Sequence, residues 1–144
     1  MADALLYAQP YGAMLHAPEV PCLIVAWYGF ANSEQFRHLM NQGLELYKAE
    51  IQRAQPLGWL ADTRGLSAIR AADQEWLATD WNQRAYLAGI RHVSFVVPES
   101  VVGQITVNTY SNHAVANTDH PITASLHRTL AEAKAELRTT LLGQ

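Results

Sequence analysis

The stretch that decides the fold class is LGWLADTRGLSAIRAADQEWLATDWNQRAYLAGIRHVSFVVPE, residues 57–99. Residues 57–61 are an apolar run that predicts a buried strand, and residues 62–65 predict a polar turn. Residues 73–89 carry an apolar stripe at helical spacing, which predicts a helix. Residues 92–97 predict a second buried strand. A strand, a helix and a strand in this order predict two parallel strands joined by a right-handed crossover.

The flanking segments extend the same pattern. Residues 5–16 predict a hairpin of two edge strands, because Pro10 and Gly12 mark a turn between two short apolar runs. Residues 22–28 are a continuous apolar run, typical of a strand that is covered on both faces. A long helix follows, capped by Asn32 or Ser33 and stopped before the next strand by a proline.

The C-terminal part continues the alternation. Residues 122–127 predict a last strand, and the sequence Thr129-Leu-Ala-Glu132 predicts a capping box that begins a final helix. Residues 101–110 have the composition of a strand, whereas the order of elements favours a helix. We therefore expect a single α/β domain over residues 1–144. Its sheet should be mixed and mostly parallel, with about five to six strands and about four helices.

Composition excludes several classes of protein. Hydrophobic residues make up 49% of the chain and charged residues 16%, which predicts a folded globular domain. The formal net charge is −3, which does not favour nucleic-acid binding. No apolar run is long enough for membrane insertion, and no signal peptide is visible, so a cytoplasmic protein is expected. The lone cysteine, Cys22, lies in an apolar run and should be buried and inert.

The carboxyl ends of the parallel strands form the first candidate site, since open α/β sheets hold ligands there. The site residues expected at this crevice are Asp62, Arg64, Ser67 and Glu99, with Thr63, Pro98 and Ser100 beside them. In this interpretation Arg64 holds a carboxylate or phosphate. In the alternative interpretation, which we favour, Asp62 and Arg64 satisfy backbone groups of a turn.

Known catalytic and metal-binding patterns are weak in this chain. The run 65–69, Gly-Leu-Ser-Ala-Ile, is close to a nucleophile elbow but lacks its second glycine. No two of the six histidines have the helical spacing of a zinc site. His113, Asp119 and His120 share one predicted loop and are the only local cluster, for which a solvated loop is the favoured interpretation. We predict no metal, no cofactor and no catalytic residue.

Four tryptophans, at positions 27, 59, 76 and 81, are many for this length. They predict either a cavity for an apolar ligand or a well-filled core. The core is favoured because Trp59 lies in a predicted strand, and Trp76 and Trp81 fall near the inward stripe of a helix. Trp81 is the one expected at the surface, since Asp80, Asn82 and Arg84 surround it. Trp81 and Arg84 would then form a partner surface.

Three motifs resemble a family of small bacterial STAS-like proteins. They are Trp59-Leu-Ala-Asp62, Asp73-Gln-Glu-Trp-Leu77 and Phe95-Val-Val-Pro-Glu99, and Trp81, Arg84-Ala85 and Gly89 add to the resemblance. The resemblance extends over about residues 5–141. It implies the fold of anti-sigma-factor antagonists, with similarity to CRAL-TRIO lipid-transfer domains. Most members of the family have no assigned biochemical role.

One departure from the partner-switching antagonists concerns phosphorylation. Those proteins carry a phosphorylated serine in an Asp-Ser-Ser-Gly turn, which this chain lacks, and Ser67 is the only serine near the corresponding place. The first hypothesis is therefore a non-enzymatic interaction or regulatory module that binds another protein or a second copy of itself. The alternative is a carrier of a small apolar ligand or lipid. An enzyme that uses the crevice residues ranks last.

Overall fold

A computed structural model describes residues 3–67, 69–97, 104, 105, 107, 108, 110, 112 and 119–143. These residues form one six-stranded sheet with the strand order β1-β2-β3-β4-β5-β6. The strands are β1 (Ala4–Gln9), β2 (Gly12–Ala17), β3 (Cys22–Gly29), β4 (Gly58–Leu66), β5 (His92–Val96) and β6 (Thr123–His127). The first three pair antiparallel and β3 to β6 pair parallel. The expected α/β class, with a mixed and mostly parallel sheet, is confirmed.

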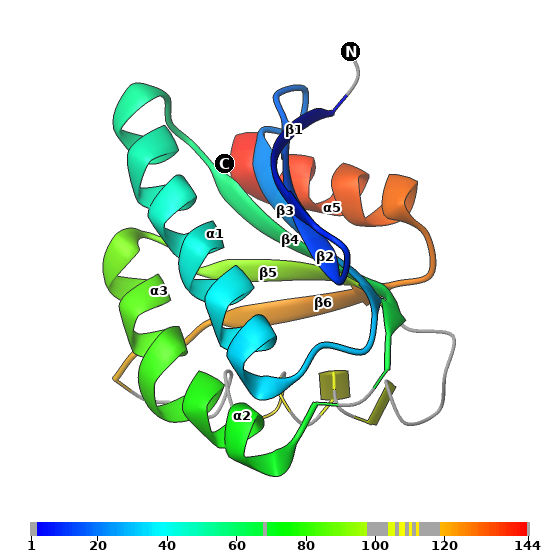
Figure 1. Cartoon of the computed structure of the whole chain (residues 1–144). Helices are drawn as coiled ribbons and strands as arrows, with labels where there is room; N and C mark the ends of the chain where they lie inside the picture. Colours follow the sequence, from blue (N-terminus) through cyan, green and yellow to red (C-terminus); the bar gives the residue numbers. More distant parts are fainter. Residues whose placement is uncertain are drawn as a thin grey trace.

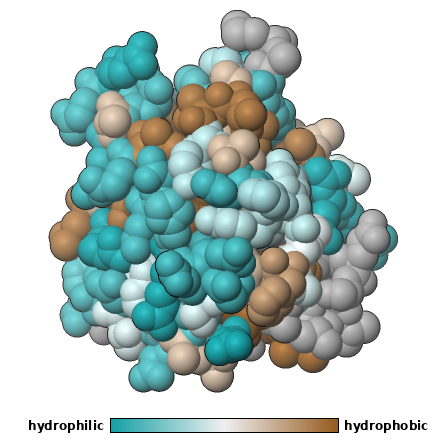
Figure 2. Space-filling model, in the orientation of Figure 1, coloured by the Kyte–Doolittle hydropathy of each residue, from teal (hydrophilic) through white to brown (hydrophobic). Residues whose placement is uncertain are grey.

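The helices cover the two faces of the sheet unequally (Figure 1). They are α1 (Ser33–Arg53), α2 (Ala71–Trp76), the π-helical segment η1 (Leu77–Trp81), α3 (Asn82–Ala88) and α5 (Leu130–Leu142). Successive right-handed crossovers between strands that advance in one direction place their helices on the same face. Helices α1 to α3 accordingly share one face, and α5 returns to the other. Figure 2 shows mainly hydrophilic residues on the outer surfaces of α1 to α3.

Two apolar clusters hold these layers together. The larger lies between the sheet and α1 to α3, and it is centred on Tyr47, Trp59 and Trp81. The smaller lies under α5, which buries Ala133 and Leu137 against strand residues that include Cys22, Ile24, Leu60 and Val96. Burial raises the pKa of the Cys22 thiol to about 12, which keeps it protonated and agrees with the expected inert cysteine.

Strand β4 is longer than the sequence predicted. The expected turn at residues 62–65 is wrong, because these residues continue the strand to Leu66. Thr63 is buried there, and its hydroxyl donates to the carbonyl oxygen of Val96 at 2.5 Å, so a polar residue is satisfied inside the strand. Gly65 allows β3 to approach, since a Cβ at this position would collide with the carbonyl oxygen of Trp27.

The second helix begins at Ala71 with Arg70 in the N-cap position, two residues earlier than the predicted start at Asp73. The Asp73 carboxylate joins two helices. It accepts a hydrogen bond from Ser33 Oγ at 2.7 Å and from Arg37 Nε at 2.8 Å, both on α1. Asp73 is buried because these two donors replace water around its charge.

Trp81 is fully buried, with an exposed fraction of 0%, which makes the expected surface position wrong. Successive steps of four residues in an α-helix drift by about 40° each, because one turn takes 3.6 residues. The π-helical segment η1 has a wider turn, which offsets this drift and keeps Asp73, Leu77, Trp81 and Ala85 all facing inward. The Trp81 indole N–H then donates to the Met40 carbonyl oxygen at 2.9 Å.

The segment at residues 101–110 is helical wherever the structure describes it, at residues 104, 105, 107, 108 and 110. Pro98, Glu99 and Ser100 lie outside the described residues. No helix in the described ranges is both long and apolar enough to cross a membrane.

Candidate functional site

The expected crevice at the carboxyl end of β4 is occupied by an ion pair. Arg64 Nε and Nη2 donate to the two carboxylate oxygens of Asp62 at 2.9 and 2.7 Å. The two side chains lie on the same face because they are two residues apart in a strand. Asp62 also accepts the Arg64 backbone N–H at 3.3 Å. The charges of Asp62 and Arg64 are therefore paired with each other within β4. The favoured interpretation, in which the two side chains satisfy the backbone of a turn, is wrong because no turn forms here.

Ser67, another predicted crevice residue, takes no part in this ion pair. The Ser67 hydroxyl oxygen is buried and has no hydrogen-bond partner in the described part of the chain. Glu99 lies outside the described residues. The structure thus brings Asp62 and Arg64 together, and it does not assemble a four-residue polar site from the residues it describes.

The partly exposed tryptophan beside Arg84 is Trp76, and not Trp81. The Arg84 guanidinium lies 5.8 Å from the Trp76 ring centroid, and the Arg37 guanidinium lies 5.2 Å from it. Arg84 Nη2 also donates to Asp80 at 3.0 Å and to Asn41 at 2.8 Å. These contacts hold α1 and the second helix together, and they leave Arg84 only half-exposed.

The tryptophans of the interior fill the core. A cavity of about 50 Å³ remains between the sheet and the helices, and its walls include Trp27, Phe36, Trp59, Trp81 and Tyr110. Pockets that hold drug-sized ligands enclose about 300–1,000 Å³. This cavity is several times smaller, so the space among the tryptophans is too small for the ligand that the apolar-ligand hypothesis places there.

Exposed aromatic side chains gather where the β1–β2 turn meets the end of β3. We call Pro10, Tyr11, Tyr28 and Phe30 the aromatic corner. Tyr28 is 57% exposed and Phe30 is 63% exposed. The backbone N–H of Tyr28 donates to the Tyr11 carbonyl oxygen at 3.0 Å, which fixes the turn against β3. Together with Gln9 and Gln35, the corner lines an open hollow of about 460 Å³.

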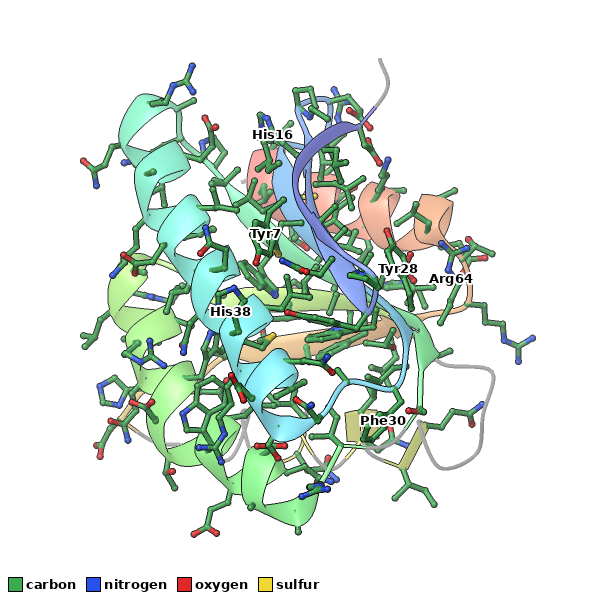
Figure 3. All side chains as sticks on the ribbon, viewed as in Figure 1. Tyr7, His16, Tyr28, Phe30, His38 and Arg64 are labelled. Carbon is green, nitrogen blue, oxygen red and sulfur yellow. The ribbon has the colours of Figure 1, made fainter. Side chains whose placement is uncertain are left out.

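The aromatic corner continues along the beginning of α1. A neighbouring hollow of about 400 Å³ shares Gln9, Tyr11 and Gln35 with the first, and Glu34 and His38 also line it. Beyond these residues, the Tyr7 hydroxyl lies 2.7 Å from His38 Nε2 and ties β1 to α1. Figure 3 shows Phe30 on the connection from β3 to α1, with Tyr28 and Arg64 at the neighbouring strand ends. The two hollows together form a groove whose aromatic end lies at the carboxyl edge of the sheet.

A second polar cluster, which the sequence analysis missed, surrounds the carboxylate of Glu136 on α5. Ser94 Oγ and Ser125 Oγ each donate to Glu136 Oε1 at 2.5 Å, and Thr140 Oγ1 donates to Oε2 at 2.6 Å. Burial alone raises the pKa of Glu136, but the hydrogen bonds from these hydroxyls and from His92 outweigh burial and hold the pKa at about 2. The carboxylate therefore stays ionised well into acid.

Two imidazoles complete this Glu136 network. His92 Nε2 and His127 Nε2 lie 3.1 and 3.5 Å from Glu136 Oε1. The same two nitrogens lie 3.1 and 3.0 Å from Ser125 Oγ. His92 Nδ1 contacts Thr123 Oγ1 at 2.6 Å. In a Ser-His-acid triad, the acid and the serine occupy opposite nitrogens of one imidazole. Here both face the same nitrogen, which is the geometry of a clamp that joins β5, β6 and α5.

A sequence signal for the Glu136 network does exist. His92-Val-Ser94 and Ser125-Leu-His127 alternate polar and apolar residues with the period of a strand, and the register places Ser94 opposite Ser125. Such alternation puts the polar residues on one face. What the sequence does not show is that α5 supplies the carboxylate between them.

Neither a metal site nor a comparison with known proteins indicates a function for the described residues. Within the described residues, no three His, Cys, Asp or Glu side chains are arranged to hold a metal ion. Of the predicted loop cluster, His113 lies outside the described residues, and His120 packs edge-on against Tyr86 with ring centroids 5.3 Å apart. No protein-family model matches the chain, and no curated protein is similar enough to it to be matched.

Proposed function

We propose that this protein is a non-enzymatic interaction module of the regulatory, STAS-like kind, and that the aromatic corner is its contact surface for a protein partner. The observation that carries the proposal is the exposure of Tyr28 and Phe30, each more than half accessible at the edge of an open hollow. Tyrosine is enriched among the residues that contribute most to protein–protein binding, and aromatic residues as a class are enriched at interfaces.

The position of the aromatic corner supports this assignment. The corner is anchored to the sheet, because Tyr28 belongs to a central strand and its backbone N–H donates to the Tyr11 carbonyl oxygen. A surface that is already ordered loses less conformational entropy when it binds. The interior cavity of about 50 Å³ also favours an interaction module over the alternative of an apolar-ligand carrier.

A photo-crosslinking residue placed at position 30 tests the proposal in cells. We expect it to capture a partner, while the same residue at position 87 does not, because Leu87 on α3 is 74% exposed but lies outside the corner. An adduct of twice the chain mass would identify the partner as a second copy. Equal capture from both positions, or capture from neither, would contradict the proposal.

Binding of the captured partner should depend on the aromatic rings themselves. We expect Tyr28→Ala and Phe30→Ala to weaken the affinity about tenfold or more each, as truncation of a residue central to an interface does. Leu87→Ala is the matched control and should leave the affinity unchanged. Circular dichroism of each variant would verify that the fold is intact. A bound small molecule in native mass spectrometry, together with no capture of a partner at position 30, would favour the ligand-carrier alternative instead.

A further inference from the structure

A third hollow lies at the opposite end of the parallel strands from the aromatic corner. It encloses about 330 Å³ at the amino-terminal ends of β4 and β5. The ends of α1, α3 and α5 gather on this side of the sheet (Figure 1), and Figure 2 shows apolar surface where Figure 1 marks the C-terminus. We call this hollow the basal pocket. Its volume falls within the range of small-molecule sites.

The walls of the basal pocket are mainly apolar. Ile51 from α1, Leu57 before β4 and Leu141 from α5 line it, and Tyr47 and Trp59 lie deeper. The Tyr47 hydroxyl donates to the Leu57 carbonyl oxygen at 2.8 Å, so its polar atom is already satisfied. These walls offer contact to an apolar body without leaving a buried polar group unpaired.

Arg91 supplies the pocket with a positive charge. Its guanidinium lies 3.6 Å from the centroid of the Tyr86 ring, and Nη1 donates to the carbonyl oxygens of Tyr86 and Ile90. Within the described residues, Nε and Nη2 donate to no protein acceptor. Arg91 is exposed, so its charge lies at the mouth of the pocket. Burial raises the pKa of Tyr47 to about 12, and the Arg91 charge acts against that rise.

No other charge competes with Arg91 among the described residues that line the pocket. Both ring nitrogens of His92 are engaged, with Thr123 on one side and with Glu136 and Ser125 on the other. The carbonyl ends of α1, α3 and α5 also meet here, and helix C-termini oppose an anion. Arg91 offsets the partial negative charge at the C-terminal end of α3, because its Nη1 donates to the carbonyl oxygen of Tyr86.

We propose that the basal pocket binds a small monocarboxylate with an apolar body. The carboxylate accepts hydrogen bonds from the free guanidinium nitrogens of Arg91, in a charge-assisted contact. The body packs on Ile51, Leu57 and Leu141. This site is separate from the aromatic corner, so it would make the module responsive to a metabolite of this chemical class.

Isothermal titration calorimetry on the full chain tests this proposal. Phenylacetate and hexanoate are the ligands, phenylacetamide is the neutral control and phenethylamine is the cationic control. We expect the carboxylates to bind and both controls to bind at least tenfold more weakly. Tighter binding of the amine would overturn the proposal, because the negative ends of the helix dipoles would then outweigh the positive charge of Arg91. Absence of carboxylate binding in the millimolar range would overturn it as well.

Variants locate the site. We expect Arg91→Gln to weaken carboxylate binding about tenfold or more. The matched control is Arg53→Gln, which removes an exposed charge at the end of α1 and leaves the pocket lining intact. Since Arg91 also supports the end of α3, Ile51→Trp provides a second variant that fills the pocket and keeps the charge. Unchanged binding in both pocket variants would refute the site, whatever the crosslinking experiment at Phe30 shows.

Discussion

Trp81→Ala is expected to lower the free energy of unfolding by about 3–5 kcal/mol, the range for deleting a large buried aromatic side chain. The substitution removes the ring that packs on Trp59 at a centroid distance of 5.3 Å. It also leaves the buried Met40 carbonyl oxygen without its indole donor. Urea unfolding followed by circular dichroism at 222 nm measures the change, and the melting temperature should fall by roughly 10–20 °C.

Two companion variants separate the contributions. Trp81→Phe retains an aromatic ring and loses the hydrogen bond to Met40, so a loss of about 1–2 kcal/mol is expected. Trp76→Ala removes a partly exposed ring from the surface between α1 and the second helix, and it should cost less than Trp81→Ala. If Trp81→Ala unfolds within 1 kcal/mol of the unmodified protein, the buried position assigned to Trp81 is wrong. Any loss of a partner in Trp81→Ala would reflect this destabilisation.

Glu136→Ala is expected to lower the free energy of unfolding at neutral pH by about 2–3 kcal/mol. It removes the acceptor of the Ser94 hydroxyl, which is fully buried, and it disconnects α5 from β5 and β6. Denaturant titration at pH 7 measures the loss. Glu45→Gln is the matched control, because it alters an exposed carboxylate on α1 and should change stability by less than about 0.5 kcal/mol.

The stability contributed by Glu136 should also depend on pH. The pKa of this carboxyl is about 2 in the folded chain, below its ordinary value of 4.5. Between these values the unfolded chain binds more protons, so stability falls as the pH falls. The contribution is fully present above about pH 4.5 and is lost as the pH approaches 2. Glu136→Gln cannot titrate, and the stability difference between it and the unmodified protein should therefore shrink over this window. A difference that stays constant from pH 7 to pH 3 would contradict the assigned hydrogen bonds.

The periodicity of apolar residues predicted most of the architecture. Burial recurs every two residues in a strand and every three to four in a helix, so the run at residues 22–28 and the stripe of α1 could be identified directly. Asn32 was one of two expected caps of α1, and its side chain accepts the Gln35 backbone N–H at 2.8 Å. A helix cap of this kind depends only on residues close together in the chain, so it can be recognised from a single sequence.

The errors share a different physical cause. Asp73 binds Ser33 and Arg37, which are 40 and 36 residues away, and Glu136 binds Ser94, which is 42 residues away. A polar residue is buried wherever a distant partner satisfies it, and hydropathy cannot identify that partner. The same reason ended the predicted strand too early at residue 61, because Thr63 is buried in β4 by its hydrogen bond to Val96, which is 33 residues away. Trp81 was misplaced because its polar neighbours Asp80, Asn82 and Arg84 were taken as a sign of exposure, whereas its ring faces inward.

The unequal covering of the sheet has a consequence for synthesis on the ribosome. Helices α1 to α3 emerge between the strands they cover, whereas the opposite face waits for α5, which follows β6. Until then Cys22, Ile24, Leu60 and Val96 have no apolar cover from Ala133 and Leu137. The nascent chain therefore carries a half-finished sheet with one apolar side open to solvent, a species prone to association. This face of the sheet is covered only when the 13 residues of α5 have been made and have docked on it.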